Sequence, residues 1–510
     1  MVDTRKTVVS CPGKVLLAGG YLVLDPNHQG YVVATPSRFY TVVQDDTADT
    51  PSEAGANERI RIRVASPQFD DGLWQYEAVK ADGEWAVTAV QSESSSTNTF
   101  VHLSVQASLQ VAAALAPSAS FRSLSVTIVG SNDFYSQSRT DGTPIPFAPL
   151  NCTIRNVHKT GLGSSAAMVT SLTSSLLLHL TADSSSPSSA PASERLPNPD
   201  PETVHLIHNL AQYVHSLAQG KVGSGFDVSA AVHGSQVYKR FAVECLEDLL
   251  DPTSTRGSKI TSQALLSVLS PSLNPAWTAP TTSGSVSRFA LPPNTLLLLA
   301  DVDAGSNTPS MVGKVLAWKK AQADEAEKVW AQLAASNERV AEACGRLTEA
   351  QKAGKEEYEK EVERLSALPV QKWSSSSVPF ADAVQRILDT RALMRRMGEG
   401  SGVPIEPPEQ TALLDACSAL PGVIGAGVPG AGGYDAIWVL CLAPSPSSSA
   451  TPPVQAVDAL LRSYTDMSVR PLSKSAWVQG GSLEAEAGLL RERLGEVEGL
   501  EKAVERGREK

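Results

Sequence analysis

Residues 159–167 combine residue types that suit the binding of a phosphate group. They read Lys-Thr-Gly-Leu-Gly-Ser-Ser-Ala-Ala, and an apolar run rich in leucine follows as far as Leu180. The glycines let main-chain N–H groups approach an anion closely, and a helix start adds unpaired donors and the positive end of its dipole. The hydroxyls of Ser164 and Ser165 can bond phosphate oxygens or Mg²⁺, and Lys159 adds a positive charge. This pattern predicts a cradle for nucleotide phosphates and, as its chemistry, phosphoryl transfer.

Two other segments have features that a functional site would need. In residues 11–25, an apolar stretch passes through a Pro-Gly turn to Lys14 and continues to a pair of glycines. Residues 425–436 are rich in glycine and lie between two apolar, strand-like runs. Taken alone, the loop at 159–167 is often only a helix cap, and the segment around Lys14 is often a β-turn with a solvated lysine. The many glycines of residues 425–436, however, imply a main chain that is pressed against another group.

Together the three segments resemble the three signature motifs of the GHMP kinases, in the order and with broadly the spacing of that family. Within the family, the sequences of several segments resemble those of the phosphomevalonate kinases, and most of all those of the larger fungal-type enzymes. The resemblance extends from about residue 8 to about residue 475. The segments that carry it are residues 19–25, 159–165, 207–212, 219–228, 405–408 and 429–437.

The resemblance implies an α+β fold of two domains. The first would be a ribosomal-S5-like α/β domain that binds ATP, and the second a ferredoxin-like α+β domain. We expect the domains at residues 1–245 and 291–475, joined by a linker or surface excursion at 246–290. A Ser- and Pro-rich insertion at about 182–201 is expected to be disordered. Residues 476–510 are expected to form a charged helical tail, which either lies on the body of the protein or is loosely ordered.

The resemblance also implies roles for individual residues. Lys14 and Asp227 would be catalytic, and Ser165, with Ser164 second, would reach Mg²⁺ through ATP. Asp227 also has a plainer interpretation as a helix N-cap. The residues implied in ATP binding are Lys159, Gly161, Leu162, Gly163, Ser164, Ser165, Ala166 and Ala167. Those implied in binding the acceptor are Lys14, Gly20, Tyr21, Lys221, Ser224, Gly225, Arg240, Gly430, Gly432 and Gly433.

The activity that the resemblance implies is the ATP-dependent phosphorylation of (R)-5-phosphomevalonate, in the mevalonate route to isoprenoids and sterols. A phosphate monoester has a second pKa of about 6 and is mostly a dianion at neutral pH, so a general base is hardly required. Asp227 is therefore expected to hold Lys14 charged and oriented. The alternatives are mevalonate kinase, the related decarboxylase or another GHMP small-molecule kinase. A non-catalytic binding protein with the GHMP fold is a further alternative, but such a protein would be expected to have lost Lys14, Ser165 and Asp227.

The periodicity of apolar residues predicts the elements that position these groups. Strands are expected at residues 31–34, 39–43, 60–64 and 124–129 in the first domain, and at 295–302 and 436–442 in the second. Helices are expected at 99–116, 201–217, 380–397 and 409–420, and two more within 314–368, broken near Gly354. His205, His208 and His215 share the helix at 201–217 and are expected to be solvated or core residues. Leu483, Leu490, Val497 and Val504 are spaced by seven but complete no coiled-coil seam.

Composition excludes several classes of protein. The 510 residues carry a net charge of −11, with a pI near 5.3, which argues against nonspecific binding to nucleic acid or to an anionic membrane. The six cysteines are scattered, and no run is apolar and long enough to be a signal peptide or a membrane span. We therefore expect a cytoplasmic protein that acts on small molecules, as a monomer or a homodimer.

Overall fold

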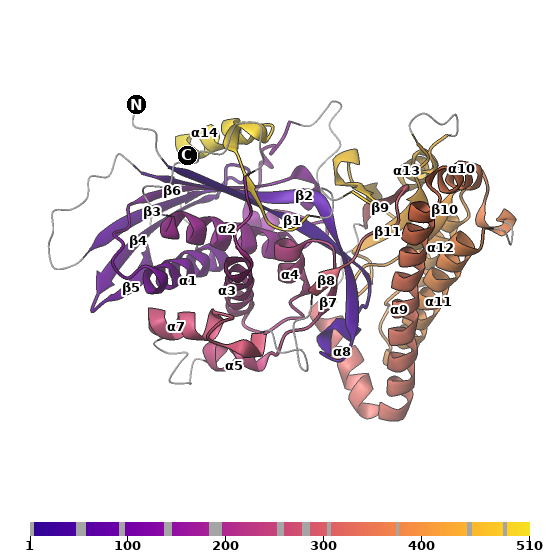
Figure 1. Cartoon of the computed structure of the whole chain (residues 1–510), viewed down its shortest axis with the longest axis horizontal. Helices are drawn as coiled ribbons and strands as arrows, with labels where there is room; N and C mark the ends of the chain where they lie inside the picture. Colours follow the sequence, from indigo (N-terminus) through magenta and orange to yellow (C-terminus); the bar gives the residue numbers. More distant parts are fainter. Residues whose placement is uncertain are drawn as a thin grey trace.

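The chain forms two bodies that lie side by side, one built on a large sheet and the other dominated by long helices (Figure 1). The computed structural model describes residues 5–46, 58–90, 97–136, 145–182, 196–251, 260–277, 286–302, 308–373, 377–445, 451–482 and 487–510.

The N-terminal sheet has nine strands, in the order β14-β1-β2-β6-β3-β4-β5, with β7 on β2 and β8 on β7. The pairing of β3 with β6 is parallel, and the other pairings are antiparallel. The two strands predicted at 31–34 and 39–43 are one long strand, β2. The strands are β1 (Lys6–Ala18), β2 (Gln29–Asp45), β3 (Arg59–Ala65), β4 (Leu73–Ala81), β5 (Glu84–Ala89), β6 (Leu124–Gly130), β7 (Gln236–Lys239), β8 (Val286–Arg288) and β14 (Leu490–Glu492).

Helices cover one face of this sheet (Figure 1). They are α1 (Thr99–Leu115), α2 (Ser164–Thr181), α3 (Pro201–Gln219) and α4 (Phe226–His233), with the short α5 (Glu244–Leu250) and α7 (Ser262–Leu269) beyond them. The side chain of Asp200 accepts a hydrogen bond from the N–H of Thr203 and so caps α3. Residues 183–195 of the expected disordered insertion lie outside the described residues.

The predicted surface excursion at 246–290 is in part a piece of the N-terminal core. Leu265 and Leu269, four residues apart on α7, are fully buried against that core, and Trp277 is almost fully buried. The indole N–H of Trp277 donates to the carbonyl oxygen of Val268. The excursion packs because its apolar residues repeat at helical spacing, a signal that its high Ser, Thr and Pro content obscured. Residues 252–259 and 278–285 lie outside the described residues.

The C-terminal sheet is antiparallel, in the order β10-β11-β9-β12, with β13 also on β9. The elements of this domain follow the order strand, helices, strand, strand, helix and strand. This is the order of a ferredoxin-like unit, as predicted. The helix break at Gly354 is confirmed, and a second, unpredicted break falls at Gln322. The elements are β9 (Thr295–Val302), α8 (Thr308–Ala321), α9 (Ala323–Ala353), α10 (Lys355–Ser366), α11 (Val378–Ser401), α12 (Pro408–Ser418), β10 (Val423–Gly427), β11 (Ala436–Leu442), α13 (Pro453–Ser463), β12 (Val469–Pro471) and β13 (Val478–Gln479).

The end of the chain returns to the N-terminal domain, and the prediction of a charged helical tail over 476–510 is wrong. β14 pairs with β1, so Leu490 is a strand residue, and Leu483 lies outside the described residues. In the described part of 476–510, only α14 (Leu500–Glu509) is a full helix, and it lies on the sheet face opposite α1–α4, so the expectation of a helix on the body holds for these residues (Figure 1). Its residues Leu500, Ala503 and Val504 are spaced to form one apolar stripe and pack on β1, β2 and β6.

Candidate active site

The glycine loop before α2 is fastened to strand β1. The N–H of Lys14 donates to the carbonyl oxygen of Leu162 over 2.9 Å. Gly161 and Gly163 have φ values of +75° and +78°, in the left-handed region that favours glycine. Gly163 is the N-cap of α2 and has no side chain to satisfy the first N–H groups of the helix. The helix start therefore presents donors to a ligand, as the sequence predicted.

Lys14 lies where three segments come together: the loop at 159–167, helix α4, and the glycine hairpin, which is the glycine-rich segment at residues 425–436 that links β10 to β11. Its Nζ donates to the carbonyl oxygen of Gly161 over 2.8 Å and lies 5.5 Å from the centre of the Phe226 ring. Burial lowers the pKa of the Lys14 ammonium below its ordinary value, while the negative charges of Asp227 and Asp435 oppose that shift. Two carboxylates thus favour the charged form of a lysine that burial would discharge.

Asp227 lies in the first turn of α4 and is half-buried. The N-cap of this helix is Gly225, with φ at +77°, so the interpretation of Asp227 as the N-cap is wrong. Its Oδ1 accepts a hydrogen bond from the N–H of Val228 over 3.0 Å, which fixes the side chain locally. A Cβ on Gly225 would lie 2.7 Å from the Phe241 ring, so glycine is also needed there for space.

Asp435 acts on Lys14 through its charge and was not among the predicted site residues. It lies at the end of the glycine hairpin, and its carboxylate is one of the two whose charge acts on Lys14. The N–H of Val302 donates to its main-chain oxygen, which holds the end of the hairpin on β9. The available signal was an acidic residue at the end of a motif that had already been singled out.

The paired glycines after β1 meet the glycine hairpin across the junction of the two domains. The N–H of Gly430 donates to the carbonyl oxygen of Leu16, and the Tyr21 hydroxyl donates to the carbonyl oxygen of Ala431 over 2.8 Å. A Cβ on Gly20 would lie only 2.1 Å from the carbonyl oxygen of Gly430. The expectation that this main chain is pressed against another group is confirmed.

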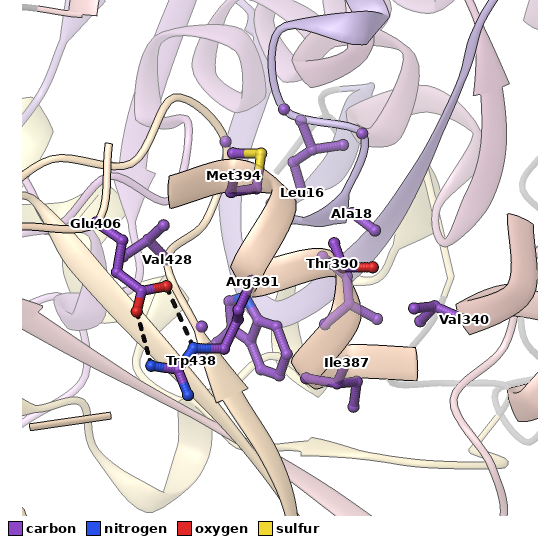
Figure 2. A pocket seen from close by; sticks show the side chains of 15 residues that line it. Leu16, Ala18, Val340, Ile387, Thr390, Arg391, Met394, Glu406, Val428 and Trp438 are labelled. Carbon is purple, nitrogen blue, oxygen red and sulfur yellow. Dashed lines mark hydrogen bonds and ion pairs between the residues drawn. The ribbon is translucent and has the colours of Figure 1, made fainter. Parts of the chain in front are cut away.

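The turn at residues 405–406 contacts the glycine hairpin and supports it. The N–H of Gly433 donates to the carbonyl oxygen of Ile405 over 2.8 Å. The buried Glu406 carboxylate accepts hydrogen bonds from Arg391 at 2.7 Å and from Arg395 at 2.8 Å. Figure 2 shows this Arg391–Glu406 pair at one side of a pocket that Leu16 and Ala18 face from the other domain. Ile405 thus holds the hairpin, and Glu406 anchors the turn on α11.

Two of the predicted acceptor residues lie in or beside the loop at 221–225. Lys221 and Arg240 line one pocket, together with Glu247. The guanidinium of Arg240 donates to the main-chain oxygens of Leu24, Val222 and Gly223. Arg240 therefore ties the loop at 221–225 in place, a role that differs from the acceptor binding that the resemblance implied.

The remaining predicted residues differ in what they can offer a nucleotide. The side chains of Leu162, Ala166 and Ala167 are buried, so these residues can contribute only main-chain groups. Lys159 is exposed and pairs by its main chain with Tyr135 at the edge of the loop. The hydroxyl of Ser165 lies within hydrogen-bond distance of the His215 ring.

The oxygen ligands of this region suit Mg²⁺ held mainly through phosphates. Within the described part of the chain, no group of three or more His, Cys, Asp or Glu residues forms a ready-made metal site. Mg²⁺ typically keeps only one or two protein ligands beside phosphates and water, and it prefers oxygen. The Ser165 hydroxyl and the Asp227 carboxylate fit that pattern.

Several known proteins are similar to this chain over most of its length. A family model described as "GHMP kinases C terminal" matches residues 380–465. The chain is 38% identical over 461 residues to the phosphomevalonate kinase of Aspergillus fumigatus, which covers 85% of this chain and 87% of that protein. It is 36% identical over 478 residues to the peroxisomal phosphomevalonate kinase of Arabidopsis thaliana, covering 86% of this chain and 90% of that protein.

Two solved structures share the fold. The Lin0012 protein from Listeria innocua superposes with a TM-score of 0.56, at 14% identity, and covers 92% of this chain and 97% of its own. The phosphomevalonate kinase of Streptococcus pneumoniae superposes with a TM-score of 0.51, also at 14% identity, covering 92% and 98%. The predicted two-domain architecture is thereby confirmed. In the described ranges, no helix is both long and apolar enough to cross a membrane.

Proposed function

The chain belongs to the phosphomevalonate kinases of the GHMP kinase family, and from that premise we propose how its residues carry out the reaction. The activity is the ATP-dependent phosphorylation of (R)-5-phosphomevalonate to (R)-5-diphosphomevalonate, in the mevalonate route to isoprenoids and sterols. The observation that carries the proposal is the position of Lys14, which donates to the loop before α2 and is acted on by the negative charges of Asp227 on α4 and Asp435 on the hairpin.

In the proposed reaction, an oxygen of the acceptor phosphate forms a bond to the terminal phosphorus of ATP. The bond from that phosphorus to its bridging oxygen breaks, and ADP leaves with the electron pair. Two polyanions must approach each other, so catalysis rests on positioning and on charge neutralisation. The Lys14 ammonium supplies positive charge between them, and the N–H groups at the start of α2 hold the phosphates of ATP.

Asp227 acts on Lys14 in this scheme, since the acceptor brings no proton that must be removed. A phosphate monoester with a second pKa of about 6 reaches the site mostly as the dianion. Asp227 and Asp435 therefore serve to keep Lys14 protonated and oriented. Ser165 and Asp227 would hold Mg²⁺, which when bound would offset the charge of the ATP phosphates.

The acceptor lies, in this proposal, between the loop at 221–225 and the glycine hairpin. Lys221 lines a pocket at that loop, and Arg240 fixes the loop's main chain. Gly430, Gly432 and Gly433 bring the hairpin main chain close to the end of β1. We keep the expectations of a monomer or homodimer and of a cytoplasmic location; all six cysteines are free, which agrees with a reducing compartment.

The test is an ADP-release assay with three acceptors: 5-phosphomevalonate, mevalonate and 5-diphosphomevalonate. We expect turnover with 5-phosphomevalonate and at least about tenfold less with the others, because mevalonate lacks the charged group for which the site is built and 5-diphosphomevalonate already carries the transferred phosphate. Lys14→Met serves as the control for background ATP hydrolysis. Faster turnover of mevalonate would assign the chain to a sibling activity. No turnover with any acceptor would instead support a non-catalytic binding protein.

A further inference from the structure

One histidine of α3 contacts the serine that the proposed function assigns to the metal. The Ser165 Oγ lies 3.1 Å from Nε2 of His215, although the two residues are 50 positions apart. Nε2 of the Gln219 side chain lies 3.1 Å from the same ring nitrogen. The His215 ring is only 6% exposed and packs beside the Phe100 ring, with 5.9 Å between the ring centres. His215 is therefore held in place and points at the start of α2.

The chemistry of these groups sets the direction of the two hydrogen bonds. The amide nitrogen of Gln219 can only donate, so the ring nitrogen that it contacts must accept. A ring nitrogen that accepts carries no proton and cannot donate to Ser165, so the Ser165 hydroxyl is the donor of its own contact and shares the single lone pair of Nε2 with the Gln219 amide. A hydroxyl has one proton and two lone pairs. Donating the proton to His215 leaves both lone pairs of Ser165 directed away from the ring.

We propose that His215 is a positioning residue that orients the Ser165 hydroxyl for the nucleotide-bound metal. The inference rests on the proposed role of Ser165 and adds a residue that lies one hydrogen bond away from the ligand. An oxygen that binds Mg²⁺ must present a lone pair, and a freely rotating hydroxyl has to be fixed before it can do so. With His215 in place, that ordering is complete before the nucleotide binds. Gln219, at i+4 on the same helix face, supports the ring.

The experiment compares two replacements of His215. His215→Phe keeps a ring of similar size but removes the acceptor, whereas His215→Gln can place its amide oxygen near the position of Nε2. The affinity for a non-hydrolysable ATP analogue is measured by calorimetry, once with saturating Mg²⁺ and once in EDTA. We expect His215→Phe to weaken binding about 3- to 10-fold in Mg²⁺, the worth of one hydrogen bond, with no change in EDTA. His215→Gln should recover most of the loss.

Steady-state kinetics give a second readout. His215→Phe should raise the KM for Mg-ATP and leave the KM for 5-phosphomevalonate unchanged. The matched control is His205→Phe, which replaces an exposed histidine of the same helix. It should leave both binding and kinetics as in the wild type. If His215→Phe does not fold, His215→Gln and Gln219→Leu carry the test, the latter with a smaller loss of the Mg²⁺-dependent affinity.

Three results would overturn the inference. His215→Phe could bind the analogue like the wild type in Mg²⁺, or lose affinity equally in EDTA, which would show a purely structural role. His215→Gln could lose as much as His215→Phe.

Ser165→Ala separates this inference from the proposed function. If Ser165→Ala leaves Mg²⁺-dependent binding intact, the proposed role of Ser165 fails and the inference fails with it. If only Ser165→Ala has an effect, the inference alone is wrong.

Discussion

Gly161, in the loop before α2, has no described atom beyond its chain neighbours within 4 Å of the position that a Cβ would take. A Cβ on Gly432, in the hairpin after β10, would lie 2.1 Å from the carbonyl oxygen of Ile405. One glycine borders open space, and the other borders protein. The loop uses glycine for its positive φ and leaves room for a ligand, while the hairpin uses it so that two main chains can touch. Two motifs that are both rich in glycine thus use it for different physical reasons.

The largest expected effect is that of Lys14→Met, because Lys14 lies between these two regions. Methionine has a similar length, so packing should survive while the charge at the reacting phosphates is lost. We expect kcat to fall by about 10²- to 10³-fold, as for removal of a comparable charge-stabilising donor. The measurement is kcat by ADP release, with the melting temperature as the check on folding. A kcat near that of the wild type would contradict the role given to Lys14.

Gly20→Ala tests the contact between main chains. The new Cβ would meet the Gly430 carbonyl oxygen, a main-chain atom that cannot rotate away. We expect a loss of about 1–3 kcal/mol in the free energy of unfolding, as for other overpacked sites, together with lower activity. Denaturant unfolding followed by fluorescence would measure the loss, since it reports both domains.

The control for that experiment is Gly313→Ala, because Gly313 lies within helix α8 with no atom near its Cβ position. Alanine favours a helix by up to about 1 kcal/mol over glycine, so this variant should be as stable as the wild type or more so. Equal stability of Gly20→Ala and the wild type would show that the two domains shift apart at no cost.

Asp227→Asn tests how the carboxylates act on Lys14. Burial already lowers the pKa of Lys14, and removing one of the charges that oppose the shift should lower that pKa further. Because the protonated lysine is the active form, activity falls as pH rises through this pKa. The alkaline limb of kcat should therefore move to lower pH in the variant, and the loss should be smallest near pH 6.5, just above the acceptor's second pKa of about 6.

The profile is recorded from about pH 6.5 to 9 for the wild type, Asp227→Asn and Asp435→Asn. Asp435→Asn should move the limb in the same direction, since its charge acts on the same ammonium. Near-complete loss in Asp227→Asn at every pH, with no recovery on acidification, would identify Asp227 as an obligatory base.

The smallest effect expected is that of Gly161→Ala, for which Gly83→Ala is the matched partner. Both glycines have positive φ, +75° and +83°, and both have empty space at the Cβ position. Each variant should lose about 1–2 kcal/mol through left-handed strain alone. Only Gly161→Ala should also raise the KM for ATP, because only its methyl group points into the expected phosphate site. Equal KM values would show that the nucleotide does not approach this loop.

Much of the site could be predicted because its residues are close together in the sequence. The loop glycines, the serines after them and the helix start all lie within residues 159–167, so pattern and local physics agree. The same holds for strands β9 and β11, whose apolar runs coincide with the observed bounds.

Contacts between distant residues were out of reach. Arg240 bonds to Leu24, and Ser165 to His215, across 216 and 50 positions of sequence. Nothing local distinguishes such residues from solvated ones. The strands β4 and β5 were missed for a different reason: they alternate buried and exposed residues over short lengths, with charged residues among them. The tail was misjudged because its charges dominate the composition, while a few buried apolar residues, among them Leu490, Leu500 and Val504, decide where it packs.

The strand β14 also bears on how the protein is made. The Ser10 hydroxyl donates to Glu492, 482 positions later, and the N–H of Leu489 donates to the carbonyl oxygen of Val232 at the end of α4. At about 5–20 residues per second, a ribosome needs about 25–100 s to travel from the first of these partners to the last. Throughout that time the edge of β1 that later pairs with β14, with its apolar Val8 and Val9, has no neighbouring strand. Such an unpaired edge is a template for association between nascent chains. The N-terminal domain is therefore the first to be synthesised and the last to complete its sheet.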